Sequence, residues 1–173
     1  MTTVVLGLGA NLGDRRTALT AAVGALKPDR VSDVYRTPPW GDDDQPDYYN
    51  IVCIATDPQR SPLDWLEAAD ACERAAGRVR DPDRRFGPRV LDVDLIAAWR
   101  DTGEPVFCGS ERLTLPHPRA HRRAFVLVPW LSIDPEAAIP GKGRVRDLLR
   151  DVALAADART LRRLGGLESN HDA

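Results

Sequence analysis

The sequence predicts an α+β fold in which strands and helices alternate in the order strand, helix, strand, strand, helix, strand. Two observations indicate this order: four short β-rich segments, and two apolar-periodic segments that carry helix start and stop signals. No internal repeat interrupts it. The order matches the split β-α-β pattern, so we expect a ferredoxin-like (βαββαβ) sandwich, followed by a C-terminal hairpin and helices.

The first strand is expected at residues 3–8, which are rich in β-forming residues. A tight glycine turn at residues 9–13 follows, in which Asn11 either closes the turn or faces substrate. Asp14 is suited to cap a helix that ends before Pro28. Its apolar face holds Leu19, Ala22, Val23 and Leu26.

The second strand is expected at residues 31–37, and the third at 49–56. Between them lie a stiff proline turn and the polar stretch 42–47, here named the acidic loop. The second long helix is expected between Ser61 and Gly77, because Ser, Pro and Asp stand at its cap, first and third positions.

An arginine-rich segment, residues 78–89, leads into the fourth strand and is here named the arginine loop. Beyond that strand we expect a hairpin around residues 104–115 and a helix opened by Pro118. A helical stretch over residues 145–164 and a frayed tail at 165–173 complete a single domain spanning residues 1–173.

Composition describes an ordinary globular protein of 173 residues with 43% hydrophobic and 29% charged residues. A net charge of −2 gives no global attraction to nucleic acid or to an anionic membrane. Cys53, Cys72 and Cys108 show no metal or disulfide spacing, which favours reduced thiols. With no signal segment and no apolar run long enough to span a bilayer, we expect a cytoplasmic protein.

Asp92 and Asp94 carry the most informative chemistry. In a strand with period two they share one face, while Leu91, Val93 and Leu95 share the other. Two adjacent carboxylates repel unless a cation lies between them, and oxygen ligands favour Mg²⁺. The alternative is a solvated acidic edge strand. The early glycines match neither a Rossmann nor a P-loop pattern, so those nucleotide folds are excluded.

Five segments in order resemble the 6-hydroxymethyl-7,8-dihydropterin pyrophosphokinase family, over nearly all of residues 3–150. The family's enzymes move pyrophosphate from ATP to a pterin alcohol in folate biosynthesis and release AMP, and their fold is a ferredoxin-like sandwich. The matching segments are Gly9-Ala10-Asn11-Leu12-Gly13, Tyr35-Arg36-Thr37-Pro38-Pro39, Gln45-Pro46-Asp47-Tyr48-Tyr49-Asn50, Arg85-Phe86-Gly87-Pro88-Arg89-Val90-Leu91-Asp92-Val93-Asp94 and Arg112-Leu113-Thr114-Leu115-Pro116-His117.

The resemblance implies a role for each matched residue. Asp92 and Asp94 would hold two Mg²⁺ ions that bridge the ATP phosphates, and Arg78 and Arg89 would face those phosphates. Arg80, Arg84 and Arg85 suit a solvated loop equally well. The nucleotide side would be formed by Glu73, Arg112, Thr114, His117 and Arg123, with Glu73 toward adenine or ribose.

The resemblance places the pterin between Tyr48 and Phe125, with Asn50 at its edge. Phe86 stands where the family often has Trp, so an aromatic remains but the indole N–H does not. Pro118 stands where some members carry Tyr. The pocket wall would be completed by Thr37, Pro38 and Pro39.

Two other classes of function would use parts of the same sequence. A nucleic-acid-binding ferredoxin-like module could use the arginine loop as a backbone clamp, but the net charge and the lack of an aromatic RNA-binding signature disfavour it. An unrelated Asp-x-Asp nucleotidyl- or glycosyltransferase would have no use for Tyr48 and Asn50 beside the proline turn. We therefore expect a monomer whose partners are ATP and hydroxymethyl dihydropterin, without nucleic acid or membrane.

Overall fold

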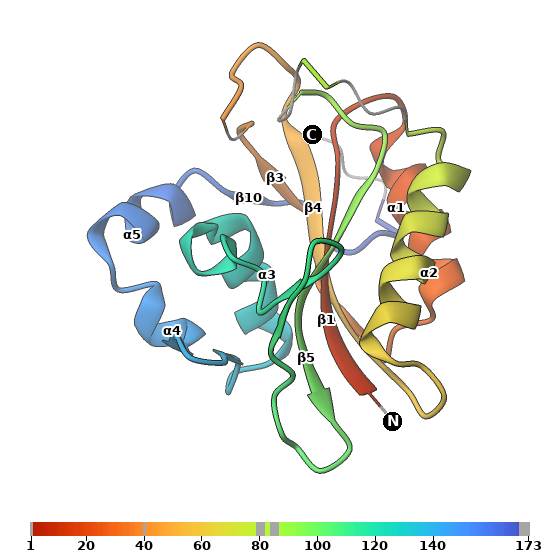
Figure 1. The fold of residues 1–173 in the computed structure, drawn as a ribbon. Helices are drawn as coiled ribbons and strands as arrows, with labels where there is room; N and C mark the ends of the chain where they lie inside the picture. Colours follow the sequence, from red (N-terminus) through yellow and green to blue (C-terminus); the bar gives the residue numbers. More distant parts are fainter. Residues whose placement is uncertain (1, 40, 79–81, 84–86, 170–173) are drawn as a thin grey trace.

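The computed structural model describes residues 2–39, 41–78, 82–83 and 87–169. A central antiparallel sheet carries two helices, α1 (Arg15–Leu26) and α2 (Pro62–Ala75), on one face and α3 (Ala124–Ile133) on the other (Figure 1). The α+β class predicted from the sequence is thus confirmed. In the described part of the chain, no helix is long and apolar enough to cross a membrane.

The sheet runs in the order β10-β3-β4-β1-β5, and every pair is antiparallel. Because β1 lies between β4 and β5, Gly9 is opposite Asn50 on one side and Asp92 on the other. The strands of this path are β1 (Thr2–Ala10), β3 (Tyr35–Thr37), β4 (Tyr48–Asp57), β5 (Asp92–Arg100) and β10 (Arg162–Arg163).

The two long helices begin as the sequence predicts. Asp14 caps α1 by accepting a hydrogen bond from the Thr17 amide, and Lys27 closes the helix in the left-handed conformation just before Pro28. Ser61 and Asp64 form a reciprocal capping box at the start of α2. These local signals need no tertiary contact, which is why the sequence predicts them well.

The predicted strand over residues 31–37 is divided. Arg30–Val31 (β2) and Tyr35–Thr37 (β3) both pair with β4, but the residues between them leave the ladder. Ser32 Oγ accepts the hydrogen bond of the Val52 amide, and the Val34 amide donates to the Gly165 carbonyl oxygen. A side chain and the C-terminal segment therefore take over backbone bonds that a continuous strand would have made.

The predicted helical stretch over residues 145–164 is confirmed only in part. The chain forms two short helices, α4 (Val145–Leu148) and α5 (Val152–Ala158), and then the edge strand β10. The predicted frayed tail is wrong for residues 165–169. The carbonyl oxygens of Gly165 and Gly166 accept hydrogen bonds, and Leu167 packs on the core. The predicted hairpin is present, formed by β6 (Cys108–Gly109) and β7 (Thr114–Leu115). A second hairpin is formed by β8 (Ala138–Ile139) and β9 (Gly143–Arg144). A 3₁₀ turn at Ala120–Arg122 precedes α3.

Each face of the sheet has its own apolar core. Leu91, Val93 and Leu95 belong to the core under α1 and α2, whereas Ile96 and Ala97 both belong to the core under α3. A register shift between β1 and β5 at Val5/Leu6 accounts for two consecutive residues facing the same side. The α3 side of β5 is therefore polar at its start and apolar from Ile96 onward.

Candidate active site

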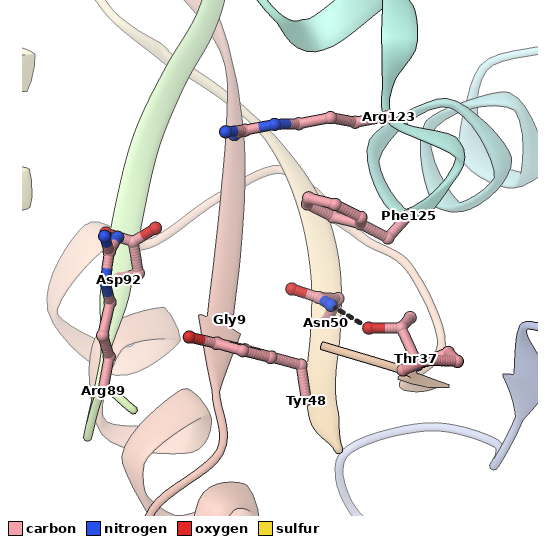
Figure 2. Close-up of a pocket in the computed structure, with 9 residues that line it drawn as sticks. Gly9, Thr37, Tyr48, Asn50, Arg89, Asp92, Arg123 and Phe125 are labelled. Carbon is pink, nitrogen blue, oxygen red and sulfur yellow. Dashed lines mark hydrogen bonds and ion pairs between the residues drawn. The ribbon is translucent and has the colours of Figure 1, made fainter. Parts of the chain in front are cut away.

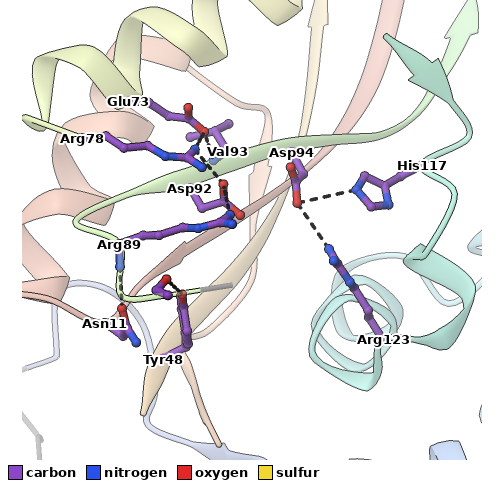
Figure 3. Close-up of polar contacts among 11 residues, drawn as sticks. Asn11, Tyr48, Glu73, Arg78, Arg89, Asp92, Val93, Asp94, His117 and Arg123 are labelled. Atoms are coloured by element: carbon purple, nitrogen blue, oxygen red, sulfur yellow. Dashed lines mark hydrogen bonds and ion pairs between the residues drawn. The ribbon is translucent and has the colours of Figure 1, made fainter. Parts of the chain in front are cut away.

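The two acids at the start of β5 share one face of the strand, as predicted, and this face is on the α3 side of the sheet. Their side chains are part-exposed, 21% for Asp92 and 32% for Asp94, while the alternating apolar neighbours are buried. Figure 3 shows the two carboxylates in contact with different partners. The strand therefore holds the acids side by side, each in its own electrostatic environment.

Asp92 is held by two arginines. Nη1 of Arg78 and Nη1 of Arg89 each lie 2.8 Å from Asp92 Oδ1. Arg78 also forms an ion pair with Glu73, and Glu73 Oε1 accepts a hydrogen bond from the Val93 amide at 2.9 Å. Burial raises the pKa of Glu73, while the Val93 bond and Arg78 oppose that rise.

The position of Glu73 differs from the one that the resemblance implies. Its carboxylate faces the β5 backbone and Arg78, so in this structure it supports Arg78 beneath Asp92 rather than presenting itself to a nucleotide. Sequence reasoning missed this contact because α2 and β5 are joined only through tertiary packing.

Asp94 faces two groups from the chain segment around α3. Arg123 Nη1 lies 3.4 Å and His117 Nε2 lies 3.8 Å from Asp94 Oδ2. Burial, followed by the charge of Asp92, raises the pKa of Asp94 to about 7. Burial, followed by the charge of Arg123, lowers the pKa of His117 to about 4. Near neutral pH, His117 is therefore uncharged.

The neutral His117 ring is oriented by a backbone amide two residues later in the chain. Its Nδ1 accepts a hydrogen bond from the Arg119 amide at 3.1 Å, which leaves the ring proton on Nε2. That N–H is directed at Asp94 Oδ2 (Figure 3). His117 can thus donate a hydrogen bond to an oxygen at this end of the site.

An open cleft begins beside Asp92 and extends between β4 and α3 (Figure 2). Tyr48 and Phe125 contribute aromatic rings, and Asn50 lies between them on β4. The space between the two rings is here named the aromatic slot, and Arg89, Asp92 and Arg123 line the same cleft. The rest of the lining is Gly9, Thr37 and Pro38. Asp94, which with Asp92 forms the acidic pair, lines a smaller pocket that shares Asp92, Asn50 and Phe125 with this cleft.

Asn50 is fixed within this cleft. The residue is only 7% exposed, and its Nδ2 donates to Thr37 Oγ1 at 2.7 Å, which turns Oδ1 toward Gly9. Tyr48 donates its phenolic hydrogen to the Gly87 carbonyl oxygen at 3.3 Å, and burial raises its pKa. Two aromatic faces and a rigid amide suit a flat heterocycle with a hydrogen-bonding edge.

Some residues that the resemblance points to lie elsewhere. The Arg112 side chain is 62% exposed, and its Nη2 lies 3.8 Å from Glu67 Oε1. Thr114 is exposed on β7, and neither residue lines the cleft. Pro39 adjoins the lining residue Pro38 but is not itself in the lining. Phe86 lies outside the described residues, as do Arg80, Arg84 and Arg85.

The structure defines the roles of two residues at the end of β1, Gly9 and Asn11. Gly9 forms the floor of the cleft, since an added Cβ would lie 2.4 Å from Asn50 Oδ1. The sequence predicts Gly9 in a turn after a strand that ends at residue 8, whereas β1 continues to Ala10 and places Gly9 inside the strand, where glycine often marks a close approach of other groups. Asn11 closes the turn, as one of its two interpretations held, and it does so by bonding to two loops.

Asp92 and Asp94 are the candidate oxygen ligands for a metal ion. Among the described residues, no group of three or more His, Cys, Asp or Glu side chains could hold a metal ion. A pair of carboxylates does not suffice for Zn²⁺ or Ca²⁺, but it matches the one or two that Mg²⁺ takes beside substrate phosphates and water.

Comparison with known proteins agrees with this geometry. Residues 5–135 match the family described as 7,8-dihydro-6-hydroxymethylpterin-pyrophosphokinase. The chain is similar to the 2-amino-4-hydroxy-6-hydroxymethyldihydropteridine pyrophosphokinases of Mycobacterium leprae (47% identical, covering 88% of this chain and 83% of the relative), Mycobacterium tuberculosis H37Rv (45%, covering 88% and 84%) and Methylorubrum extorquens (43%, covering 86% and 92%).

Solved structures show the same fold at low sequence identity. A crystal structure of an HPPK-DHPS protein in complex with substrates is 10% identical, with a TM-score of 0.67 over 94% of this chain. A Plasmodium falciparum HPPK-DHPS wild-type structure with SDX-DHP is 12% identical, with a TM-score of 0.64 over 94% of this chain. The chain spans just under half of each, 46% and 47%.

Proposed function

The chain belongs to the 7,8-dihydro-6-hydroxymethylpterin-pyrophosphokinase family, and we infer that it transfers pyrophosphate from ATP to the hydroxymethyl group of 6-hydroxymethyl-7,8-dihydropterin. In this reaction the pterin oxygen bonds to the β-phosphorus of ATP, the bridge to the α-phosphate breaks, and AMP leaves. The product belongs to folate biosynthesis. ATP is therefore a co-substrate and not a resident cofactor.

One observation carries the proposal: Asp92 lines the same cleft as the aromatic slot, and it joins this cleft to the pocket of Asp94. A pterin ring between Tyr48 and Phe125 would present its edge to Asn50, whose amide is already oriented by Thr37. Its substituent could then point along the cleft toward Asp92. Holding the hydroxymethyl oxygen close to the polyphosphate supplies the proximity that bimolecular transfer requires.

The acidic pair fits Mg²⁺ by its donor chemistry. Asp92 and Asp94 offer carboxylate oxygens on one strand face. Burial, followed by the charge of Asp92, raises the pKa of Asp94, and a bound divalent cation would favour the ionised form against both causes. Bound Mg²⁺ would withdraw charge from the ATP phosphates during transfer. We propose that these two residues hold two such ions.

The arginines of the site would serve the phosphates. Arg78 and Arg89 pair with Asp92 in this structure, at side-chain exposures of 12% and 22%. A polyphosphate could exchange with the carboxylate for these guanidinium groups, each of which can grip two oxygens. Arg123 and the Nε2 hydrogen of His117 point into the same region from the other side.

The other proposed contacts of ATP are Glu73, Arg112 and Thr114, which lie outside the cleft lining. Arg112 and Thr114 would need to contact ATP from the β6–β7 hairpin outside the cleft, and Glu73 would have to give up its contacts with Val93 and Arg78. Pro39 and Phe86 remain proposed parts of the pterin wall.

The organisation of the molecule completes the proposal. The strand order β3-β4-β1-β5, with α1 and α2 on one face, supports a ferredoxin-like core. We propose a single domain that acts as a monomer in the cytoplasm without binding nucleic acid. Its cysteines are free thiols, which agrees with a reducing compartment.

The test is to incubate the protein with ATP, Mg²⁺ and the hydroxymethyl dihydropterin and to identify the nucleotide product. Pyrophosphate transfer releases AMP, whereas ordinary phosphoryl transfer releases ADP. Asp101→Asn serves as a matched control for Asp92→Asn, because Asp101 is an exposed acid just after β5 and outside the cleft. ADP as the product, or equal rates for the two variants, would contradict the proposal.

A further inference from the structure

Asn11 lies at the C-terminal end of β1, between the two loops that flank the cleft. The residue is 2% exposed, so its amide group is withdrawn from solvent. Its Oδ1 accepts a hydrogen bond from the Arg89 amide at 2.8 Å. Its Nδ2 donates to Gln45 Oε1 at 2.8 Å and to the Pro46 carbonyl oxygen at 2.9 Å.

These bonds use both donor hydrogens of the Asn11 side chain and one acceptor site. No donor remains for a substrate, which excludes the interpretation in which Asn11 binds substrate through its amide hydrogens. Asp could not donate, and Gln would extend the amide by one methylene in a closed site. Asn is thus the residue type that fits this junction.

The partners of Asn11 lead directly to functional side chains. Arg89 presents its guanidinium to Asp92 in the cleft, and Pro46 is two residues before Tyr48 of the aromatic slot. Tyr48, the first residue of β4 after the acidic loop, itself donates to the carbonyl oxygen of Gly87 in the arginine loop. The end of the arginine loop and the end of the acidic loop are therefore joined through Asn11.

We propose that Asn11 is a positioning residue, which sets the distance between the phosphate-facing Arg89 and the pterin-facing Tyr48. It touches neither substrate and acts through the backbone of Arg89 and of the acidic loop. Misplacing a reacting or charge-stabilising group by about 1 Å can cost on the order of 100-fold in rate. The inference rests on the proposed function, since it concerns the position and orientation of side chains assigned to that reaction.

The Asn11→Ala variant retains a backbone connection between residue 11 and Arg89. The Asn11 amide also donates to the Arg89 carbonyl oxygen at 3.1 Å, and this backbone bond survives truncation of the side chain. The fold should therefore persist, while the loops lose their side-chain joint. Ser32→Ala is the matched control, because Ser32 is also buried and its hydroxyl bonds to the Val52 amide and the Asp33 carbonyl oxygen, both outside the two loops.

A double-mutant cycle tests the proposal with Asn11→Ala, Arg89→Ala and the combined variant, measured as AMP release. We expect Asn11→Ala alone to lower kcat by roughly 10- to 100-fold. In the Arg89→Ala background the same change should cost less than about threefold, because no guanidinium remains to be aimed. Ser32→Ala should keep a kcat close to that of the wild type.

Equal losses from Asn11→Ala in both backgrounds, or an equal loss in Ser32→Ala, would show a general effect on stability and overturn the proposal. If Asn11→Ala does not fold, Asn11→Asp enters the same cycle, since it keeps an acceptor for the Arg89 amide but loses both donors. A wild-type protein that releases no AMP would instead overturn the proposed function, so the two failures are distinguishable.

Discussion

Gly9→Ala offers the most direct test of the pterin slot, because the structure gives the size of the clash. A Cβ on Gly9 would lie 2.4 Å from Asn50 Oδ1 and 3.3 Å from Tyr48 Cδ1. The first distance is far below carbon–oxygen contact, so the amide must move. It cannot turn freely, since its Nδ2 is bonded to Thr37 Oγ1 at 2.7 Å.

The expected loss follows from that displacement. Moving Asn50 gives up the bond to Thr37 and leaves the pterin edge without its partner, and an unsatisfied buried polar group costs about 1–3 kcal/mol. That range corresponds to a pterin Kd raised by roughly 5- to 150-fold. ATP affinity should change by less than about twofold, because Asn50 makes no contact assigned to the nucleotide.

The assay is a pair of calorimetric titrations, pterin in the presence of Mg²⁺ and a non-hydrolysable ATP analogue, and the analogue alone. Gly7→Ala is the matched control: it lies on the same face of β1, and its Cβ would meet Ile96 Cδ1 at an ordinary 3.4 Å. If pterin affinity in Gly9→Ala stayed within about threefold of the wild type, or fell equally in both variants, the slot would have been placed wrongly.

Three further predictions concern the acids, the amide and the histidine. Asp92→Ala or Asp94→Ala should lose several kcal/mol of transition-state stabilisation, seen as a near-complete loss of AMP release with the unfolding midpoint in urea little changed; turnover within about threefold of wild type would refute metal binding there. Asn50→Ala should weaken pterin binding by ~1 to 3 kcal/mol while sparing ATP, and equal losses in the two titrations would make Asn50 a scaffold residue. The pKa of His117 is lowered from 6.5 to about 4 in the folded protein, so the unfolded chain binds more protons between these values and stability falls as pH drops through that window. In metal-free buffer, His117→Gln should therefore lessen the acid-induced loss of unfolding free energy by up to roughly 3 kcal/mol, and identical pH profiles of urea unfolding for the two proteins would argue against it.

Local signals made much of the fold predictable. The alternation from Leu91 to Leu95 correctly placed both acids on one face, and the caps at Asp14 and Ser61 correctly placed the helix starts. Each of these features depends on neighbours within a few residues, and so is written in the sequence itself.

Contacts between distant segments account for the errors. β10 has only two residues and no periodicity of its own, so its pairing with β3 could not be inferred, and neither could the break at Ser32 that accompanies it. The ion pairs of Arg78 depend in the same way on how α2 lies against β5. The joint at Asn11 likewise connects residues that adjoin only after folding.

The central place of β1 has a consequence for how the molecule matures. Gly9 becomes part of the site only when β1 has paired with β4 on one side and with β5 on the other, and these strands come from opposite halves of the chain. Closing such long loops is slow compared with forming α1 or α2. During synthesis the site around Gly9 cannot be completed before Asp92 has emerged from the ribosome, because β5 begins there. The nascent chain can therefore form helices and part of the sheet well before it can acquire activity.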